Sequence, residues 1–241
     1  LKMEEYINNR KVWAIIPARG GSKGVIRKNI KDFCGQSLLT RSINCLKNSR
    51  CFEKIIVTSD DSEILEIANM NNVETHQRKS KLESKDDVMT DIPVLSFLNQ
   101  IPMNERPEFT FMIQCTAPFM SSKKYKSAVS VLLKNPNSTV FAAEHAHQFL
   151  WEESEENLMS WKPINHPFHE RAGRQFINKV QVNETGAFYG FSTENFISSG
   201  FRFHNKAIPI LTDKIESIDI NDETDWKFAE LIYKQILNKK K

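Results

Sequence analysis

A loop rich in glycines and cations follows a strand-like run near the start of the chain. The run and loop read Ile15-Ile16-Pro17-Ala18-Arg19-Gly20-Gly21-Ser22-Lys23-Gly24-Val25-Ile26-Arg27-Lys28-Asn29. Three of the eight glycines fall within five residues, so the backbone can turn its N–H groups toward a ligand without Cβ atoms in the way. The loop also carries four cationic side chains, Arg19, Lys23, Arg27 and Lys28. Arginine can bind phosphate through its planar guanidinium, and lysine through an ammonium group on a flexible side chain. This glycine loop, residues 19–29, therefore predicts a polyphosphate site.

The spacing of the glycines differs from two common nucleotide-binding patterns. A P-loop requires Gly-x-x-x-x-Gly-Lys-Ser/Thr, and a dinucleotide fold requires Gly-x-Gly-x-x-Gly before a helix. The loop matches neither pattern, which disfavours a kinase-type NTPase and an NAD-dependent dehydrogenase. The alternative interpretation is a solvated turn whose cations face water.

A second group of polar residues lies near the other end of the chain. In the carboxylate segment, residues 217–222, alternation places Asp219 and Asn221 on one side and two isoleucines on the other. Carboxylate and amide oxygens suit Mg²⁺, which keeps several waters and takes few protein ligands. Asp222 and Asp225 are interpreted as the N-cap and first-turn acid of a final helix. Cations together with a distant carboxylate are typical of metal-assisted phosphoryl or nucleotidyl transfer.

The elements that position these groups alternate between strands and helices. Strands are expected at Val12–Pro17, Lys54–Ser59, Phe109–Cys115, Thr139–Ala143, Gly186–Phe191 and Ala207–Leu211. Helices are expected at Leu38–Lys47, Ser62–Asn71, Pro93–Gln100, Tyr125–Leu133 and Glu223–Leu237, with N-cap candidates at Asp61-Ser62 and Ser121-Ser122. This order predicts an α/β fold with a doubly wound, mostly parallel sheet in one main domain.

Three segments should meet at one edge of that sheet. Ligands of such sheets bind outside the carboxyl ends of the strands. The glycine loop, residues 59–61 and residues 114–116 all follow predicted strands, so we expect them to converge on one crevice. From about residue 145 to 182 the chain is rich in aromatics and has no clear period. We interpret this segment as an inserted arm whose aromatics either contact a partner or form a local core.

Composition excludes several classes of protein. The 241 residues carry a net charge of +3, too mild to indicate nucleic-acid or membrane binding. No apolar run approaches the roughly 20 residues that a bilayer requires. The four cysteines fit neither a disulfide framework nor a zinc motif. We expect a soluble, cytoplasmic protein with free thiols.

These motifs together resemble the acylneuraminate cytidylyltransferases, also called CMP-sialic acid synthetases. The resemblance covers nearly the whole chain, and its most specific element is residues 17–24 followed by Arg27-Lys28-Asn29, where Ile26 replaces the usual proline. The supporting elements are Ile56-Val57-Thr58-Ser59-Asp60-Asp61, Gln114-Cys115-Thr116-Ala117-Pro118, Arg174-Gln175, Glu184-Thr185-Gly186-Ala187-Phe188-Tyr189 and Ser217-Ile218-Asp219-Ile220-Asn221. The resemblance implies a three-layer, Rossmann-like fold of the nucleotide-diphospho-sugar transferase type, as a single domain over residues 1–241 with a dimerisation arm at about 145–185.

The resemblance also implies a reaction and a role for each site residue. The family joins CTP to the anomeric hydroxyl of an α-keto sugar acid, releasing pyrophosphate with Mg²⁺. The implied triphosphate-binding residues are Arg19, Gly20, Gly21, Ser22, Lys23 and Lys28. Asn29 and Arg78 would contact the cytidine, although Arg78 could equally belong to a solvated loop. Gln114 would face the sugar acid, and Asp219, with Asn221, would hold the metal. Arg174 and Gln175 would enter the site of a neighbouring subunit, which implies a homodimer with exchanged arms.

Departures from the family pattern concern the acceptor. Asn221 stands where many relatives have a second Asp, and Cys115, Ala117 and Met120 replace a typical Pro, Ser and Arg. Phe149 and Asn183 fall near positions that some sialic acid enzymes fill with Lys and Arg. We therefore expect a modified nine-carbon acid of legionaminic or pseudaminic type. One alternative is an enzyme for the eight-carbon acid Kdo. The other is a nucleotide-binding relative without catalysis, which is supported by Asn221 in place of a second Asp.

Overall fold

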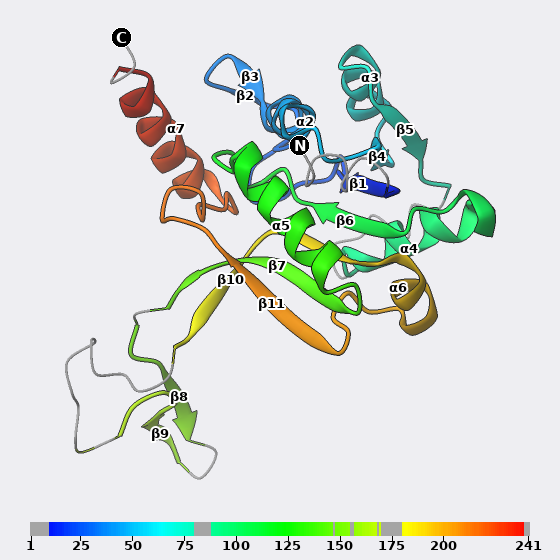
Figure 1. Cartoon of the computed structure of the whole chain (residues 1–241). Coiled ribbons are helices and arrows are strands. Elements are labelled where there is room, and N and C mark those ends of the chain that lie inside the picture. The colour runs from blue at the N-terminus through cyan, green and yellow to red at the C-terminus, as the bar shows by residue number, and fades with distance from the viewer. Residues whose placement is uncertain are drawn as a thin grey trace.

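The computed structural model is an α/β fold built on a seven-stranded sheet (Figure 1). It describes residues 10–79, 88–146, 148–154, 157–167, 169 and 180–238, without the side chains of residues 157–159, 237 and 238. The strand order is β11-β7-β10-β6-β1-β4-β5. These strands are β1 (Val12–Pro17), β4 (Lys54–Ser59), β5 (Glu74–Gln77), β6 (Phe109–Ile113), β7 (Ser138–His145), β10 (Val182–Ser192) and β11 (Lys206–Leu211).

Helices cover both faces of this sheet, which explains why its central strands are apolar on both sides. Val12, Ala14 and Ile16 of β1 pack into one core, and Trp13 and Ile15 pack into the other. The helices are α2 (Leu38–Ser49), α3 (Ser62–Met70), α4 (Asp91–Gln100), α5 (Ser122–Lys134), α6 (Thr193–Ser199) and α7 (Glu223–Asn238), with a 3₁₀ turn η2 (Met103–Glu105). Helices α2, α3, α5 and α7 contribute to the first core, and α4 and α6 to the second. The predicted layered fold is confirmed.

Most predicted elements are present, but three features differ. Strand β5 and helix α6 were not expected, because each is short and neither has a clear apolar period. The strand expected at residues 186–191 is β10, which runs antiparallel to both β6 and β7, while the other four pairings in the main sheet are parallel. The N-cap at Asp61 is confirmed by bonds from Glu63 N and Ile64 N, whereas Ser121 makes no capping bond.

The carboxyl ends of β1, β4 and β6 lie at one edge of the sheet. All three strands are parallel, so the segments that follow them leave in the same direction. Backbone bonds tie these exits together: Ala18 N donates to Thr58 O (3.0 Å), and Arg78 N donates to Ser59 O (2.8 Å). The glycine loop and residues 59–61 and 114–116 therefore meet at one edge, as predicted, but residues 59–61 do not line the crevice itself.

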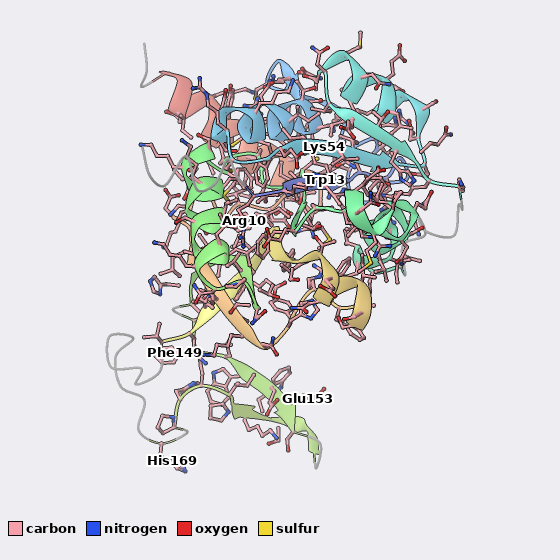
Figure 2. The ribbon with its side chains drawn as sticks, turned by 45° about the vertical axis from the view of Figure 1, so that its right-hand side comes forward. Arg10, Trp13, Lys54, Phe149, Glu153 and His169 are labelled. Carbon is pink, nitrogen blue, oxygen red and sulfur yellow. The ribbon has the colours of Figure 1, made fainter. Side chains whose placement is uncertain are left out.

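A separate hairpin projects from the main sheet (Figure 1). Its strands are β8 (Trp151–Ser154) and β9 (Asn157–Pro163), and a smaller pair, β2 (Asp32–Phe33) and β3 (Gln36–Ser37), precedes α2. Figure 2 shows Phe149 and Glu153 on this projection, away from the helices of the main sheet. Phe149 and Trp151 pack against His166, while the side chain of Trp161 is 56% exposed. Among the described helices, none combines the length and apolarity needed to cross a bilayer.

Candidate functional site

A cavity of about 370 Å³ opens at the edge where β1 and β6 end. It brings together eight of the predicted site residues, namely Arg19, Ser22, Lys23, Lys28, Asn29, Arg78, Gln114 and Asn221. Its other lining residues are Pro17, Gly24, Val88, Met89, Thr90, Pro93, Cys115 and Thr116. Four cationic side chains thus share one cavity with polar groups from three other parts of the chain.

Two of the three glycines of the loop are required by close approach. A Cβ on Gly24 would collide with the carbonyl oxygen of Asn221, and a Cβ on Gly20 would collide with the carboxylate of Asp61. Gly21 has no atom within 4 Å of its Cβ position. None of the three has a positive φ, and it is Arg27 that adopts the left-handed conformation, with φ 57°. Gly24 therefore lets the loop touch the carboxylate segment, which no residue with a side chain would allow.

Residues 59–61 brace the loop from outside the cavity. Gly20 N donates to Asp60 Oδ1 (3.2 Å), and Arg27 pairs with Asp61 (2.5 Å) and with Glu63. Partial burial opposes ionisation of Asp61, but the bond and charge of Arg27 together with the backbone N–H bonds from Ile64 and Glu63 outweigh it and hold the pKa of Asp61 below its usual range. The expectation that Arg27 joins the phosphate-binding cations is wrong, because its guanidinium is held by these carboxylates and does not line the cavity.

Lys28 connects the glycine loop to the carboxylate segment. Its Nζ donates to Ile220 O (2.7 Å), and Ile220 N donates to Thr116 O (2.9 Å). Burial lowers the pKa of Lys28, and the nearby carboxylate of Asp219 partly opposes this shift. The two ends of the chain are thus joined at the cavity through 192 residues of sequence separation.

Asp219 and Asn221 lie together, as alternation predicted. Asn221 Nδ2 donates to Asp219 Oδ2 (3.0 Å); Asn221 lines the cavity, whereas Asp219 lies behind it and does not. The other oxygen, Asp219 Oδ1, is buried and receives no hydrogen bond from any described residue. Within the described ranges no three His, Cys, Asp or Glu side chains form a metal cluster. A cation with one carboxylate ligand and several waters suits this donor set better than a closed protein site.

The remaining acids of this region cap helix α7. Asp222 Oδ1 accepts from Thr224 N (2.7 Å) and Asp225 N (2.9 Å), and Asp225 Oδ2 accepts from Asn221 N (2.8 Å). The interpretation of Asp222 as an N-cap is confirmed. These bonds also fix the backbone of Asn221, so the cap of α7 positions the cavity wall.

Asn29 and Arg78 form a buried part of the cavity. Asn29 Nδ2 donates to Arg19 O (3.1 Å), which fixes the start of the loop. Arg78 is only 6% exposed, and its Nη2 donates to Thr58 O (3.1 Å) at the end of β4. The alternative that Arg78 belongs to a solvated loop is wrong, because this backbone bond holds it against the sheet.

Gln114 lies where β6 meets β10. Its backbone N donates to Ala187 O (3.0 Å), and the neighbouring Gly186 has a φ of 75°, in the left-handed region that favours glycine. Burial raises the pKa of the neighbouring Cys115 thiol to about 12, so this cavity residue is a neutral thiol. Ala117 and Met120, which also depart from the family pattern, pack in the core and do not line the cavity. Arg174 and Gln175 lie outside the described residues.

One wall of the cavity could not be found from the sequence. This wall, here called the 88–93 wall, lies at the start of helix α4. It consists of Val88, Met89 and Thr90, which precede the helix, and of Pro93 in its first turn. Apolar residues at the start of a helix carry no chemical signature. Asp91, in the same turn, is buried and paired with Arg202, which is 111 residues away. Only the fold could reveal that pairing.

Known proteins resemble this chain over most of its length. The family model described as Cytidylyltransferase matches residues 13–180. A pseudaminic acid cytidylyltransferase of Campylobacter jejuni is 30% identical over 91% of this chain and 95% of its own length. An N-acylneuraminate cytidylyltransferase A of Danio rerio is 30% identical over 92% of this chain, which spans 50% of that protein. An N-acylneuraminate cytidylyltransferase of Escherichia coli is 25% identical over 91% of this chain and 51% of its own length.

Solved structures share the fold. A CMP:2-keto-3-deoxy-manno-octonic acid synthetase complexed with CTP has a TM-score of 0.67 at 10% identity, covering 93% of this chain and 99% of its own. A 4-diphosphocytidyl-2C-methyl-D-erythritol synthase from Anaerococcus prevotii has a TM-score of 0.64 at 14% identity, with the same coverages. The family model spans more than half of the chain and includes the glycine loop, the 88–93 wall and Gln114. The resemblance read from the motifs is confirmed, and the chain belongs to the cytidylyltransferase family.

Proposed function

We propose that the protein transfers CMP from CTP to a nine-carbon 2-keto sugar acid, with release of pyrophosphate. The observation that carries this proposal is the cavity itself, in which Arg19, Lys23 and Lys28 surround a space bounded by the segment that holds Asp219. A triphosphate is the ligand that such a set of cations neutralises well. Relatives named for this chemistry support the choice of CTP.

The proposed step is an in-line displacement at the α-phosphorus of CTP. The anomeric hydroxyl oxygen of the sugar acid would form a bond to that phosphorus and lose its proton to water, while the bond from phosphorus to the pyrophosphate oxygen breaks. Arg19, Ser22 and Lys23, with the backbone of the loop, would hold the β- and γ-phosphates. Lys28, fixed by Ile220 O, would lie at the α-phosphate. Catalysis would then depend on positioning and on neutralising charge on the leaving pyrophosphate.

Mg²⁺ fits the residues present. Asp219 Oδ1 is a buried carboxylate oxygen without a hydrogen-bond donor among the described residues, and Asn221 lies next to it. Asp219 would hold the ion, with Asn221 as a second contact and water and phosphate oxygens as the other ligands. The ion would supply charge neutralisation to the triphosphate when bound.

The proposed acceptor is a pseudaminic-type acid. The relative that bears this name matches 95% of its own length, whereas the N-acylneuraminate enzymes are matched over about half of theirs. Cys115, which departs from the typical family pattern, lies in the cavity wall next to Gln114, the residue proposed to face the sugar. The second candidate is N-acetylneuraminate. The eight-carbon acid is less favoured, because the octonic acid synthetase resembles this chain at only 10% identity.

Pyrophosphate release from CTP and Mg²⁺ tests the reaction across four acids: pseudaminic, legionaminic, N-acetylneuraminic and Kdo. We expect turnover with the pseudaminic-type acid and its loss in Lys23→Ala. Lys123→Ala, an exposed lysine on α5 outside the cavity, is the matched control and should turn over normally. CTP binding without turnover on any acid would instead support a non-catalytic nucleotide-binding relative.

The proposal includes a homodimer and a cytoplasmic location. The projecting hairpin with its exposed Trp161 would pack on a second copy and bring Arg174 and Gln175 into the partner's site. Mixing inactive Lys23→Ala with inactive Arg174→Ala tests this exchange, because only a mixed dimer can rebuild one complete site. We expect about a quarter of wild-type activity on mixing. No recovery would show that Arg174 acts within its own subunit. The four cysteines, all free thiols, fit a reducing compartment that supplies CTP.

A further inference from the structure

A buried ion pair anchors the turn that carries the 88–93 wall. Arg202 Nε donates to Asp91 Oδ1 (3.0 Å), and Nη2 donates to Asp91 Oδ2 (2.6 Å). The side chains are 17% and 6% exposed. Such a two-point contact fixes orientation as well as distance, because the guanidinium and the carboxylate are both planar.

Arg202 is itself held by strand β10. Its guanidinium lies 4.3 Å from the ring centre of Tyr189, whose hydroxyl donates to Glu184. Burial raises the pKa of Tyr189, so the ring keeps its hydroxyl proton at neutral pH. Thr139 Oγ1 donates to Arg202 O (2.6 Å), which ties its backbone to β7. Arg202 is therefore fixed to the sheet and in turn fixes the position of Asp91.

Asp91 lies between residues that line the cavity. Val88, Met89 and Thr90 before it and Pro93 two residues after it line the cavity, whereas Asp91 does not. Thr90, at the N-cap position of α4, makes no side-chain capping bond, so the local sequence provides little to fix this turn. Its long-range anchor is the bond from Asp91 to Arg202.

We infer that Arg202 is a positioning residue for the nucleoside end of the cavity and sets the affinity for CTP through Asp91. The inference rests on the proposed function, since Arg78 and Asn29, which share the cavity with the 88–93 wall, are proposed to contact the cytidine. Arg202 bonds Asp91 and Thr139 and stacks on Tyr189, and none of these three residues lines the cavity. Its loss should therefore weaken nucleotide binding and leave the chemical step intact.

The test compares three variants with one control. Arg202→Met removes the anchor, Arg202→Lys keeps the charge without the planar fork, and Asp91→Asn removes the carboxylate charge. The control is Arg10→Met, which breaks another Arg–carboxylate pair, Arg10 with Glu108 (2.6 Å), at the amino end of β1 and far from the cavity. Steady-state kinetics with CTP and with the sugar acid are combined with direct titration of CTP and Mg²⁺ binding.

We expect Arg202→Met to raise the KM and the dissociation constant for CTP about tenfold, with kcat and the sugar-acid KM within about twofold. Arg202→Lys and Asp91→Asn should give smaller increases of the same kind, and Arg10→Met none. A merely structural pair would lower the active fraction, and hence kcat, without changing the CTP dissociation constant. That result, or unchanged CTP binding in all three variants, would overturn the inference.

The design separates this inference from the proposed function. Wild-type protein that neither binds CTP nor turns it over would refute both. Wild-type protein that turns over CTP, with Arg202 variants that bind CTP normally, would refute only the role of Arg202. If Arg202→Met does not fold, Arg202→Lys and Asp91→Asn still decide the matter, because each keeps a hydrogen-bonding group at the buried position.

Discussion

The glycine loop and the 88–93 wall line the same cavity, but they are held in different ways. The loop is fixed at several points: Asn29 bonds Arg19 O within it, Arg27 and Lys28 bond distant segments, and Gly20 and Gly24 allow close approach to their neighbours. The 88–93 wall depends on one bidentate ion pair, Asp91 with Arg202. The role of a residue can therefore be predicted from the sequence where its side chain would contact the ligand, but not where it acts through another residue.

Removing the anchor of the 88–93 wall should produce the largest effect on stability. Arg202→Met leaves the carboxylate of Asp91 buried without its partner, and we expect a loss of about 3–5 kcal/mol in the free energy of unfolding. The double variant Asp91→Leu with Arg202→Met should recover most of that loss, because it leaves no unpaired charge. Urea unfolding at neutral pH measures both. A loss below about 1 kcal/mol in the single variant would place this pair with ordinary surface ion pairs.

Disturbing the glycine loop should affect activity strongly. In Gly24→Ala the new Cβ meets the carbonyl oxygen of Asn221, so the loop or the carboxylate segment must shift, and we expect kcat/KM to fall about 100-fold. Ile26→Ala is the control in the same loop, because Ile26 is exposed and does not line the cavity, and we expect a change within about twofold. Equal losses in the two variants would show that the effect does not come from close approach at Gly24.

The pH dependence of CTP binding should report on Lys28. Its pKa is lowered by burial, so it loses its proton at a lower pH than an exposed lysine does. Because Lys28 is a cation only below that pKa, we expect the KM for CTP to rise by about tenfold as the pH is raised through it. In Lys28→Arg the rise should disappear over the same range, since arginine stays charged. An identical alkaline rise in that variant would assign the titration to another group.

The smallest effect is expected at the metal ligands proposed for the carboxylate segment. Asn221→Asp places a second carboxylate beside Asp219 Oδ2, now 3.0 Å from the Asn221 amide. We expect the Mg²⁺ concentration for half-maximal activity to fall about threefold, while kcat changes little. A magnesium titration at saturating CTP measures this. A higher magnesium requirement would mean that Asn221 does not face the ion.

The sequence predicted much of the fold because its central elements are strongly patterned. The bounds of β1 and β4 were predicted to the residue, and α2, α4 and α5 to within three residues at each end. Strand β5 and helix α6 were missed, since each is short and partly polar. The antiparallel direction of β10 could not be predicted, because a strand's apolar pattern is the same in either direction.

The candidate site divides in the same way. Arg19, Lys23, Lys28 and Asn29 could be found from the sequence, because phosphate binding requires a dense local set of cations and glycines. Arg27 belongs to the same set, yet the fold pairs it with Asp61 and Glu63 and removes it from the cavity. Charge alone does not reveal the direction in which a side chain points.

The sequence by itself determined the chemistry of this protein: the cations of the glycine loop, the carboxylate at Asp219 and the strands that carry them. Only the tertiary structure decided how distant segments meet, as in Lys28 with Ile220 O, Gly24 with Asn221 and Asp91 with Arg202. The physical reason is that local pattern reflects burial and backbone preference within a few residues. Contacts across 100 residues or more depend on sheet order and register, which form only when the whole chain packs.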